Sequence, residues 1–351
     1  MNLGAIIVIA NPGGTFARKP PAGDVLRGNS LSCFDVAGRS LTERIIDRYL
    51  GAGIDLVSVL IEEPACGDLS TFHVTSAKVN IAVVSDLNSA IARRLQNYSE
   101  NGLARSFVQW TNVYAETDLL DFFYFHRASK LPVTWAFDAD GSLPMCVIDC
   151  ANRPTIDFPL AAQNPAQNAA SYLIHGYVKR LTHPKNLREF AADMLQGRCE
   201  CRPSGHESKP GVWIDASAEL HRGARIVAPA YIGRGSKIMD DTLITRLSCI
   251  EKNCCVDCGT VIENSSVLAN TQVGIWLDVC HAVVSGNRLL SLSRDMTVEV
   301  SDPDLIRFTA AASRSTSEAS HRLEDYRRAP DFQTPSALPE AWQFVSNFIR
   351  E

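Results

Sequence analysis

The amino-acid sequence predicts an α/β domain followed by a parallel β-helix. Short apolar runs alternate with helical patterns over residues 1–150, and from Ile214 an aliphatic residue recurs at every sixth position. The length of 351 residues suits two domains of about 150 residues each better than one. We expect the α/β domain at 1–200, the β-helix at 209–292, and a flexible linker with a C-terminal helix at 293–351.

The composition excludes several classes of protein. Hydrophobic residues make up 46% and charged residues 21%, close to globular averages, so the chain is not mainly disordered. With 34 Lys and Arg against 39 Asp and Glu the net charge is −5, and we expect no nucleic acid among the partners. No apolar run approaches about 18 residues, so we expect no membrane span.

The first 150 residues justify the α/β prediction. Runs typical of buried strands cover residues 5–10, 55–61, 80–84, 106–110, 132–137 and 144–150. Helical patterns cover residues 41–50, 87–95 and 118–126. Alternation of this kind favours a mainly parallel sheet covered by helices. Residues 164–180 and 185–195 are also expected to be helical, with Pro184 at a first-turn position that tolerates proline.

The β-helix prediction rests on a column of aliphatic residues with a period of six. Its members are Ile214, Leu220, Ile226, Ile232, Ile238, Ile244, Ile250, Val256, Ile262 and Leu268. Four residues after each stands a small or short residue, down to Ser266. A left-handed parallel β-helix places the aliphatic side chain in its interior and the small residue at a tight corner. We expect the pattern to slip by three after Leu268 and to resume at Leu277, Val283 and Leu289 in a fourth coil.

The last part of the chain predicts a linker and an amphipathic helix. Residues from 310 onward are polar and include Pro330, Pro335 and Pro339, which is typical of a surface linker. Helical spacing over 340–350 gathers apolar residues on one face: Trp342, Val345, Phe348 and Ile349. We expect this face to pack against the rest of the protein, and binding of a partner is the alternative.

The cysteines predict no metal cluster. Cys255 and Cys258 resemble half of a zinc site, but a structural zinc ion needs four converging ligands. The period of six explains Cys254 as a corner residue, and Cys199 and Cys201 are expected to be inert. The chain has 11 cysteines, some inside apolar runs, and no basic segment before its first apolar run. We therefore expect a reducing, cytoplasmic location and no signal peptide.

Five local motifs carry a resemblance to a known family. They are residues 5–10 with Gly13 and Gly14, residues 35–41 (DVAGRSL), residues 117–126 with 132–134, residues 176–187, and residues 209–214 (KPGVWI). Over residues 3–290 the chain resembles the sugar-1-phosphate nucleotidyltransferases, or NDP-sugar pyrophosphorylases, and in particular the mannose-1-phosphate guanylyltransferase group. The resemblance implies a Rossmann-like, GT-A-like nucleotidyltransferase domain joined to a left-handed β-helix.

The resemblance also implies a reaction, which this sequence is poorly equipped to catalyse. In the family, a nucleoside triphosphate and a sugar 1-phosphate give an NDP-sugar and pyrophosphate, with Mg²⁺ held by two aspartates and with a lysine nearby. Here Leu31 stands at the lysine position, Asn112 at the first aspartate and Arg180 at the second. An amide binds a hard cation weakly and a guanidinium repels it. We expect no metal site and an impaired nucleotidyl transfer, with no catalytic residue assigned.

The resemblance assigns candidate ligand contacts by position. They are Asn11, Gly13, Gly14, Arg18 and Lys19 for the nucleotide, and Asn112, Lys179 and Arg180 for the phosphate or sugar. In this interpretation Arg180 supplies the charge that the metal would have supplied, because a guanidinium pairs well with phosphate oxygens. The predicted protein binds a nucleotide sugar or sugar phosphate in a regulatory or sensor role. We expect a homo-oligomer or a complex with an active paralogue.

Two alternative functions stay open. An active sugar-1-phosphate nucleotidyltransferase would need Mg²⁺ on other ligands, such as Asp118 or Asp149. A hexapeptide-repeat acyltransferase would need a histidine base, for which His221 and His281 are the candidates. A corner or surface position is the simpler interpretation of both histidines.

Overall fold

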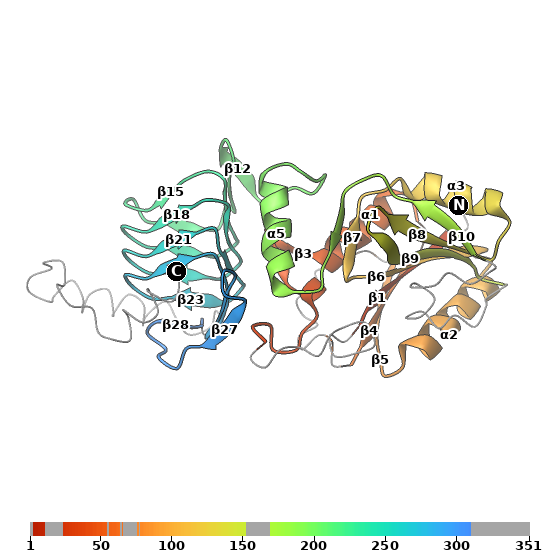
Figure 1. Ribbon diagram of the computed structural model, residues 1–351, viewed down its shortest axis with the longest axis horizontal. Coiled ribbons are helices and arrows are strands. Elements are labelled where there is room, and N and C mark those ends of the chain that lie inside the picture. Colours follow the sequence, from red (N-terminus) through yellow and green to blue (C-terminus); the bar gives the residue numbers. More distant parts are fainter. Residues whose placement is uncertain are drawn as a thin grey trace, which may run out of the picture. The chain divides into compact units, whose positions relative to one another are not determined.

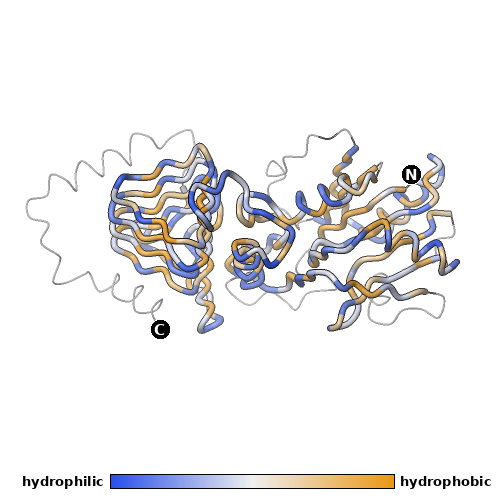
Figure 2. The backbone as a smooth tube through the Cα atoms, turned by 90° about the horizontal axis from the view of Figure 1, so that it is seen from above, coloured by the Kyte–Doolittle hydropathy of each residue, from blue (hydrophilic) through white to orange (hydrophobic). Residues whose placement is uncertain are grey.

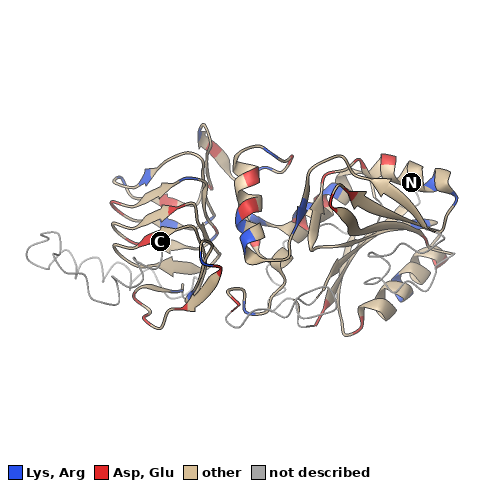
Figure 3. Cartoon of the chain, viewed as in Figure 1, with Lys and Arg blue, Asp and Glu red and all other residues tan. Residues whose placement is uncertain are grey.

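A computed structural model describes residues 3–10, 24–54, 56–63, 65, 76, 78–151 and 169–309 (Figure 1). The chain divides into two compact units. The first consists of Met1–Phe34, Arg39–Leu187 and Arg198–Cys201, and the second of Asp35–Gly38, Arg188–Gly197 and Arg202–Glu351. The expected C-terminal helix at 340–350 lies outside the described residues. Along the described chain, basic and acidic residues are interspersed rather than gathered on one element (Figure 3).

The first unit is built on a mixed seven-stranded sheet with the strand order β10-β8-β9-β6-β1-β4-β5. Its strands are β1 (Leu3–Ile9), β4 (Leu56–Glu62), β5 (Val79–Val84), β6 (Arg105–Trp110), β8 (Val133–Asp138), β9 (Gly141–Asp149) and β10 (Ala169–Leu173). Strand β1 pairs in parallel with β4 and β6, and every one of its residues is buried. Such a continuous apolar run is typical of a central parallel strand. Only β9 is antiparallel to its neighbours β6 and β8. The expected α/β architecture, Rossmann-like in outline, is confirmed.

Helices cover both faces of this sheet. They are α1 (Leu41–Gly51), α2 (Leu87–Glu100) and α3 (Leu119–Ser129). The Phe107 ring contacts Tyr49 of α1 and Phe122 of α3, whereas its neighbour Val108 belongs to the apolar cluster beneath α2. Adjacent strand residues face opposite ways, so α2 lies on the face opposite to α1 and α3 (Figure 1). Among the described residues no helix is long and apolar enough to cross a membrane.

The expected helix over residues 164–180 is wrong in its described part. Residues 169–173 form edge strand β10, which pairs in parallel with β8. Residues 178–180 form β11 (Val178–Arg180), which pairs antiparallel with β7 (Val113–Ala115). Pairing with neighbouring strands outweighs the local helical pattern here. The next expected helix is confirmed as α5 (Pro184–Leu195).

The second unit is a stack of short strands arranged in three sheets. The parallel strands are β13 (Val212–Ile214), β14 (Glu219–Leu220), β15 (Arg225–Ile226), β16 (Ala230–Ile232), β17 (Lys237–Ile238), β18 (Leu243–Thr245), β19 (Ser248–Ile250), β20 (Cys255–Val256), β21 (Val261–Glu263), β22 (Ser266–Val267), β23 (Thr271–Val273), β24 (Asp278–Cys280) and β25 (Ala282–Ser285). Each strand pairs with the strand one coil later, so that Ile232 lies beside Ile250. This arrangement is consistent with a parallel β-helix. Figure 2 shows hydrophobic and hydrophilic segments alternating along each coil.

The aliphatic column departs from the expected spacing at the same corner of two successive coils, where Val267 follows Ile262 and Val284 follows Val279 by five positions. Ile250 lies beside Val267, and Leu268 is not its partner, so this coil is one residue short. Leu268 is buried away from the column, which continues through Val273, Val279 and Val284. The predicted slip of three residues, with Leu277, Val283 and Leu289 in the column, is therefore wrong.

The shortened corner explains the change of spacing. In one coil the corner uses two residues with positive φ, Arg246 and Leu247, whereas the next coil turns on Asn264 alone. One fewer turn residue brings the chain back to the interior one position early. At the start of the stack, Leu220 is 39% exposed because only one neighbouring coil covers it.

The stack ends in antiparallel strands. Strand β25 pairs antiparallel with β26 (Arg288–Ser291), which pairs antiparallel with β27 (Met296–Glu299). Strand β28 (Ile306–Phe308) pairs antiparallel with β23, and β12 (His206–Lys209) pairs antiparallel with β13 at the other end.

The small residues at the corners connect successive coils through hydrogen bonds. The Thr260 hydroxyl donates to the Gly274 carbonyl at 2.6 Å and accepts from the Leu277 amide at 3.1 Å. Ser265 makes the same pair of contacts with Val279 and Ala282, one position before the Ser266 that the sequence pattern indicates. A buried corner leaves backbone groups without strand partners, and these side chains satisfy them.

Candidate functional site

Strands β7 and β11 bring together two positions that the sequence assigns to the site. Arg180 lies opposite Val113, and the Leu181 amide donates to the Asn112 carbonyl at 2.7 Å. Asn112 and Arg180 are therefore neighbours on paired backbone segments, although 68 positions separate them in the sequence. These are the two positions at which the resembled family carries its metal-binding aspartates.

The Arg180 side chain is engaged by a carboxylate that the sequence analysis missed. Its Nη1 and Nη2 atoms donate to Asp138 Oδ2 and Oδ1 at 2.5 and 2.6 Å, and Asp140 Oδ2 lies 3.7 Å from Nη1. The hydrogen bonds from Arg180 hold the pKa of Asp138 below its usual value. The Arg180 side chain is 34% exposed and therefore accessible, but both of its Nη atoms already donate to Asp138. An anionic ligand would have to compete with Asp138 for the guanidinium.

Lys179 does not converge with Arg180. It lies opposite Tyr114 on β7, whereas Arg180 lies opposite Val113. Consecutive strand residues face opposite sides of a sheet, so these two basic side chains leave the β7–β11 ribbon on different faces.

The residues at the metal positions do not fit Mg²⁺. The side-chain oxygen of Asn112 is buried and has no hydrogen-bond partner within the described part of the chain. It is a neutral oxygen, and its neighbour on β11 carries a cation. Over the residues that the structure describes, no three His, Cys, Asp or Glu side chains are grouped so as to hold a metal ion. We derive no chemical step through a metal.

The two carboxylates considered as substitute metal ligands have other partners. Asp118 is the N-cap of α3 and accepts from the Leu120 and Asp121 amides at 2.9 and 3.1 Å. Asp149, on β9, forms an ion pair with Arg105, whose Nε lies 2.8 Å from Asp149 Oδ1, and the same oxygen lies 3.4 Å from His126. Neither residue belongs to β7 or β11.

Other predicted site residues lie apart from this ribbon or outside the description. The nucleotide-loop candidates all lie outside the described residues: Asn11, Gly13, Gly14, Arg18 and Lys19. Leu31 opens a short 3-10 helix, η1 (Leu31–Cys33).

The V-A-G segment forms a tight hairpin between β2 (Asp35–Val36) and β3 (Arg39–Ser40), and its residues Asp35–Gly38 belong to the second unit. Ala37 and Gly38 both have positive φ, and their amides donate to Glu251 Oε1 and Oε2 at 2.7 and 3.0 Å. Glu251 is 2% exposed. A Cβ on Gly38 would lie 2.2 Å from the Tyr231 hydroxyl, so only glycine fits this turn. The turn amides bind a protein carboxylate and are not available to a ligand in this arrangement.

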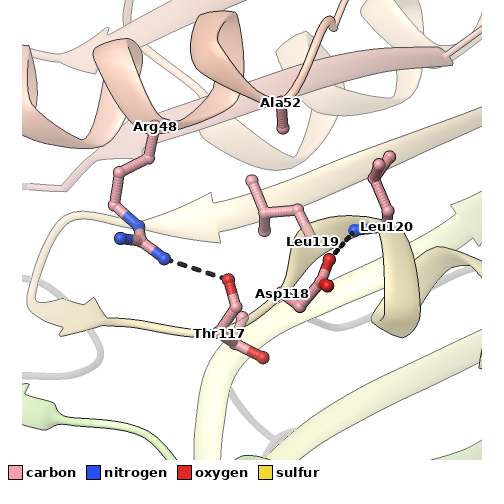
Figure 4. A pocket seen from close by; sticks show the side chains of 6 residues that line it. All are labelled: Arg48, Ala52, Thr117, Asp118, Leu119 and Leu120. Carbon is pink, nitrogen blue, oxygen red and sulfur yellow. Dashed lines mark hydrogen bonds between the residues drawn. The ribbon is translucent and has the colours of Figure 1, made fainter.

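A small open pocket lies at the start of α3 (Figure 4). It is lined by Arg48, Ala52, Thr117, Asp118, Leu119 and Leu120. Arg48 donates to the Thr117 carbonyl at 2.9 Å, and the Asp118 carboxylate caps the helix. The pocket contains none of the residues predicted to contact a nucleotide or sugar.

The histidines proposed for acyl transfer both lie at the surface of the second unit. His221 Nδ1 is 2.7 Å from Asp240 Oδ1, and His281 Nδ1 is 2.6 Å from the Asn264 side-chain nitrogen. Of the cysteines, Cys254 is a buried corner residue as expected, and its thiol contacts the Leu268 carbonyl at 3.1 Å.

No protein-family model matches this sequence, and no curated protein matches it either. The function of this protein must therefore be inferred from its fold and from the geometry of the β7–β11 ribbon.

Proposed function

We propose that the first unit is a GT-A-like nucleotidyltransferase domain that binds a nucleotide sugar or sugar phosphate and transfers nucleotidyl groups poorly, if at all. In this proposal the second unit is a left-handed β-helix, and the protein is a cytoplasmic regulator or sensor. The observation that carries the proposal is the pairing of β7 with β11, which sets Asn112 beside Arg180. An amide and a cation occupy neighbouring positions where transfer would require two carboxylates.

The chemistry of transfer supports an impaired reaction. A sugar phosphate attacks the α-phosphorus of a nucleoside triphosphate, and the charge on the departing pyrophosphate must be neutralised. Loss of even one well-placed electrostatic contact to a transition state costs about 10²–10³ in rate. Arg180 would itself be a cation near the phosphates, but Asp138 already compensates its charge.

The same pair suggests how a ligand would be sensed. Phosphate and carboxylate compete for the same two guanidinium donors with similar geometry. Binding of a sugar phosphate to Arg180 would release Asp138, which sits at the end of β8 before the hairpin to β9. Ligand binding would in this way be coupled to a change at that hairpin.

The proposed second unit would provide the contact to partners, either a second copy of this chain or an active paralogue. In the five-stranded and four-stranded sheets of the stack, outward-facing strand residues such as Lys237 and Leu243 are only half-buried. We expect the partner surface on these outward faces, and no nucleic acid among the partners.

A pyrophosphate-release assay tests the proposal directly. The protein is incubated with Mg²⁺, a panel of nucleoside triphosphates and a panel of sugar 1-phosphates. We expect no turnover, together with a thermal shift on addition of at least one nucleotide sugar or sugar phosphate. Clear turnover would remove the impaired-enzyme proposal, and indifference of the wild-type protein to every ligand would remove the binding proposal.

A hexapeptide-repeat acyltransferase is a second candidate, favoured by one observation. His221 and Asp240 form a histidine–carboxylate pair at 2.7 Å, a geometry in which a carboxylate orients an imidazole base. Consumption of acetyl-CoA that disappears in His221→Ala but persists in His281→Ala would support this candidate. Absence of consumption with a panel of amine and hydroxyl acceptors would exclude it.

A further inference from the structure

A second cluster of reactive groups in the first unit includes Tyr114 of β7, the residue opposite Lys179 on β11. The backbone bends at Cys199 and Glu200, shortly after α5, and Cys201 follows the bend. Cys201 is half-buried, and its sulfur lies 2.9 Å from the Tyr114 hydroxyl. Cys199 is buried, and its sulfur contacts the Cys201 carbonyl at 3.9 Å.

A chain of hydrogen bonds leads from Cys201 to a buried carboxylate. The Tyr114 hydroxyl donates to Glu116 Oε1 at 3.2 Å, and the same oxygen accepts the Glu200 amide at 2.7 Å. Burial raises the pKa of Glu116 above its usual value. A proton leaving Cys201 can therefore pass to the tyrosine oxygen as the tyrosine proton passes to Glu116.

The charges around Cys201 favour its thiolate. The hydrogen bond from Cys199 is the largest influence that lowers the pKa of Cys201, followed by the Tyr114 hydroxyl and the positive charge of Arg44 on α1. Burial and Glu116 act in the opposite direction and do not prevail. Arg39 also interacts electrostatically with Cys201.

In several other cysteines the protonated thiol is favoured over the thiolate. Burial raises the pKa of Cys146, Cys150, Cys249, Cys254, Cys255 and Cys258. Buried thiols without a stabilising donor or cation react slowly with electrophiles. The environment of Cys201 is thus distinct from that of these cysteines.

We propose that Cys199 and Cys201 form a redox-active dithiol, with Cys201 as the nucleophile toward a low-molecular-weight disulfide and Cys199 as the resolving thiol. The Cys201 thiolate attacks one sulfur of the disulfide, a mixed disulfide forms, and one thiolate departs. Cys199 then loses its proton and attacks the Cys201 sulfur, which forms the Cys199–Cys201 disulfide and releases the second thiol. The small-molecule disulfide is reduced by two electrons and the protein dithiol is oxidised by two.

The first test uses the reduced full-length wild-type protein and oxidised glutathione. After brief exposure at neutral pH, free thiols are blocked and the digest is mapped by mass spectrometry. We expect the earliest modification on the tryptic peptide that begins at Cys199, first as a glutathione adduct and then as an internal disulfide. Earlier modification of half-buried Cys33 or Cys258, with the Cys199 peptide untouched, would overturn the proposal.

Variants separate the two roles. Cys199→Ser should accumulate the glutathione adduct on Cys201, whereas Cys201→Ser should leave Cys199 unmodified on the same timescale. Cys33→Ser is the matched control, because this half-buried cysteine lies in the same unit and should not change the outcome. Adduct formation on Cys199 in the Cys201→Ser variant at the wild-type rate would refute the assigned order.

Tyr114 is a positioning residue in this scheme, and its test is a pH profile. Tyr114→Phe removes the hydroxyl that stabilises the thiolate, so alkylation of Cys201 by iodoacetamide at neutral pH should slow by roughly three- to tenfold. The wild-type and variant rates should converge above about pH 9.5, where an ordinary thiol is ionised without help. The pH profile depends on Cys201 and on the groups that face it: Cys199, Arg39, Arg44, Tyr114 and Glu116. Identical profiles for both proteins would show that the hydroxyl plays no part.

Discussion

Arg180 and Asp138 form a bidentate ion pair, in which each guanidinium Nη atom lies within 2.6 Å of one carboxylate oxygen. Arg180 stands on β11 at a position where the resembled family carries an acid, and its partner comes from β8. The charge of Arg180 is thus compensated from within the protein. The guanidinium is accessible to solvent, but its hydrogen-bond donors are already bound to Asp138.

Asp138→Asn should strengthen binding of an anionic sugar ligand. The substitution keeps the shape of the side chain but removes its charge, so phosphate no longer competes with a carboxylate for Arg180. We expect up to about tenfold tighter binding by calorimetry, which corresponds to about 1.4 kcal/mol. Asp140→Asn is the control, because that side chain is 85% exposed and more distant. Unchanged affinity in Asp138→Asn, with loss of binding in Arg180→Ala, would show that the ligand uses Arg180 without displacing Asp138.

The Arg180–Asp138 ion pair should make the stability of the first unit depend on pH in the acid range. Arg180 lowers the pKa of folded Asp138, so the ionised carboxylate stabilises the fold above the ordinary aspartate value of about 3.9. That contribution is lost as the pH falls through the lowered pKa of the folded state. In Arg180→Met the melting temperature should therefore lie below wild type at neutral pH and approach it in acid. A difference that is constant from neutral pH to acid would contradict this linkage.

Thr260→Val should destabilise the second unit. The buried hydroxyl donates to Gly274 and accepts from Leu277, and valine has the same shape without either bond. Two backbone groups would be left unsatisfied, at a cost of about 1–3 kcal/mol in the free energy of unfolding. Urea denaturation followed by circular dichroism measures this cost. Thr245→Val is the control, since Thr245 neighbours the interior residue Ile244 and so faces outward. Equal effects of both substitutions would refute a specific role for the Thr260 hydroxyl.

Gly38→Ala and Gly53→Ala should differ in effect although both glycines have positive φ, at 91° and 78°. Around Gly53 a Cβ would meet open space, so only the backbone conformation is penalised, by about 1–2 kcal/mol. A Cβ on Gly38 would also collide with Tyr231 and Ser204, which adds about 1–3 kcal/mol. Thermal denaturation compares the two variants. A smaller loss of stability in Gly38→Ala than in Gly53→Ala would mean that the hairpin relaxes away from the contact.

Much of the fold follows from local sequence patterns. The apolar run of β1 and the period of six from Ile214 each determine where a side chain must lie, so both elements could be located in advance. The one-residue shortening at Asn264 could not, because either Val267 or Leu268 is a suitable interior residue and only the corner geometry chooses between them. Residues 169–173 were expected to be helical from their local pattern. Their strand partner β8 is distant in the sequence, so no local pattern could reveal the pairing.

The candidate site was predictable only in part. Positions Asn112 and Arg180 could be paired from the resemblance, and the β7–β11 ribbon does make them neighbours. Asp138 could not be foreseen, since nothing in a local pattern indicates which carboxylate meets a given arginine across 42 residues. The contact of Cys201 with Tyr114 could not be foreseen either, because it joins residues 87 positions apart in the sequence.

The antiparallel strands at both borders of the eight-stranded sheet have a consequence for self-association. A stack of parallel coils offers its terminal backbone as a template on which another molecule could continue the pattern, and such open edges promote fibres. Here β12 and β27 run along the two borders of that sheet in place of a further parallel coil. At the β12 border the strand runs opposite to the coil strands, so a further parallel coil finds no strand of its own polarity there, whereas β27, reversed twice relative to β25, runs in the coil direction. The reversed strand β12 therefore discourages continuation of the parallel stack at that border of the sheet.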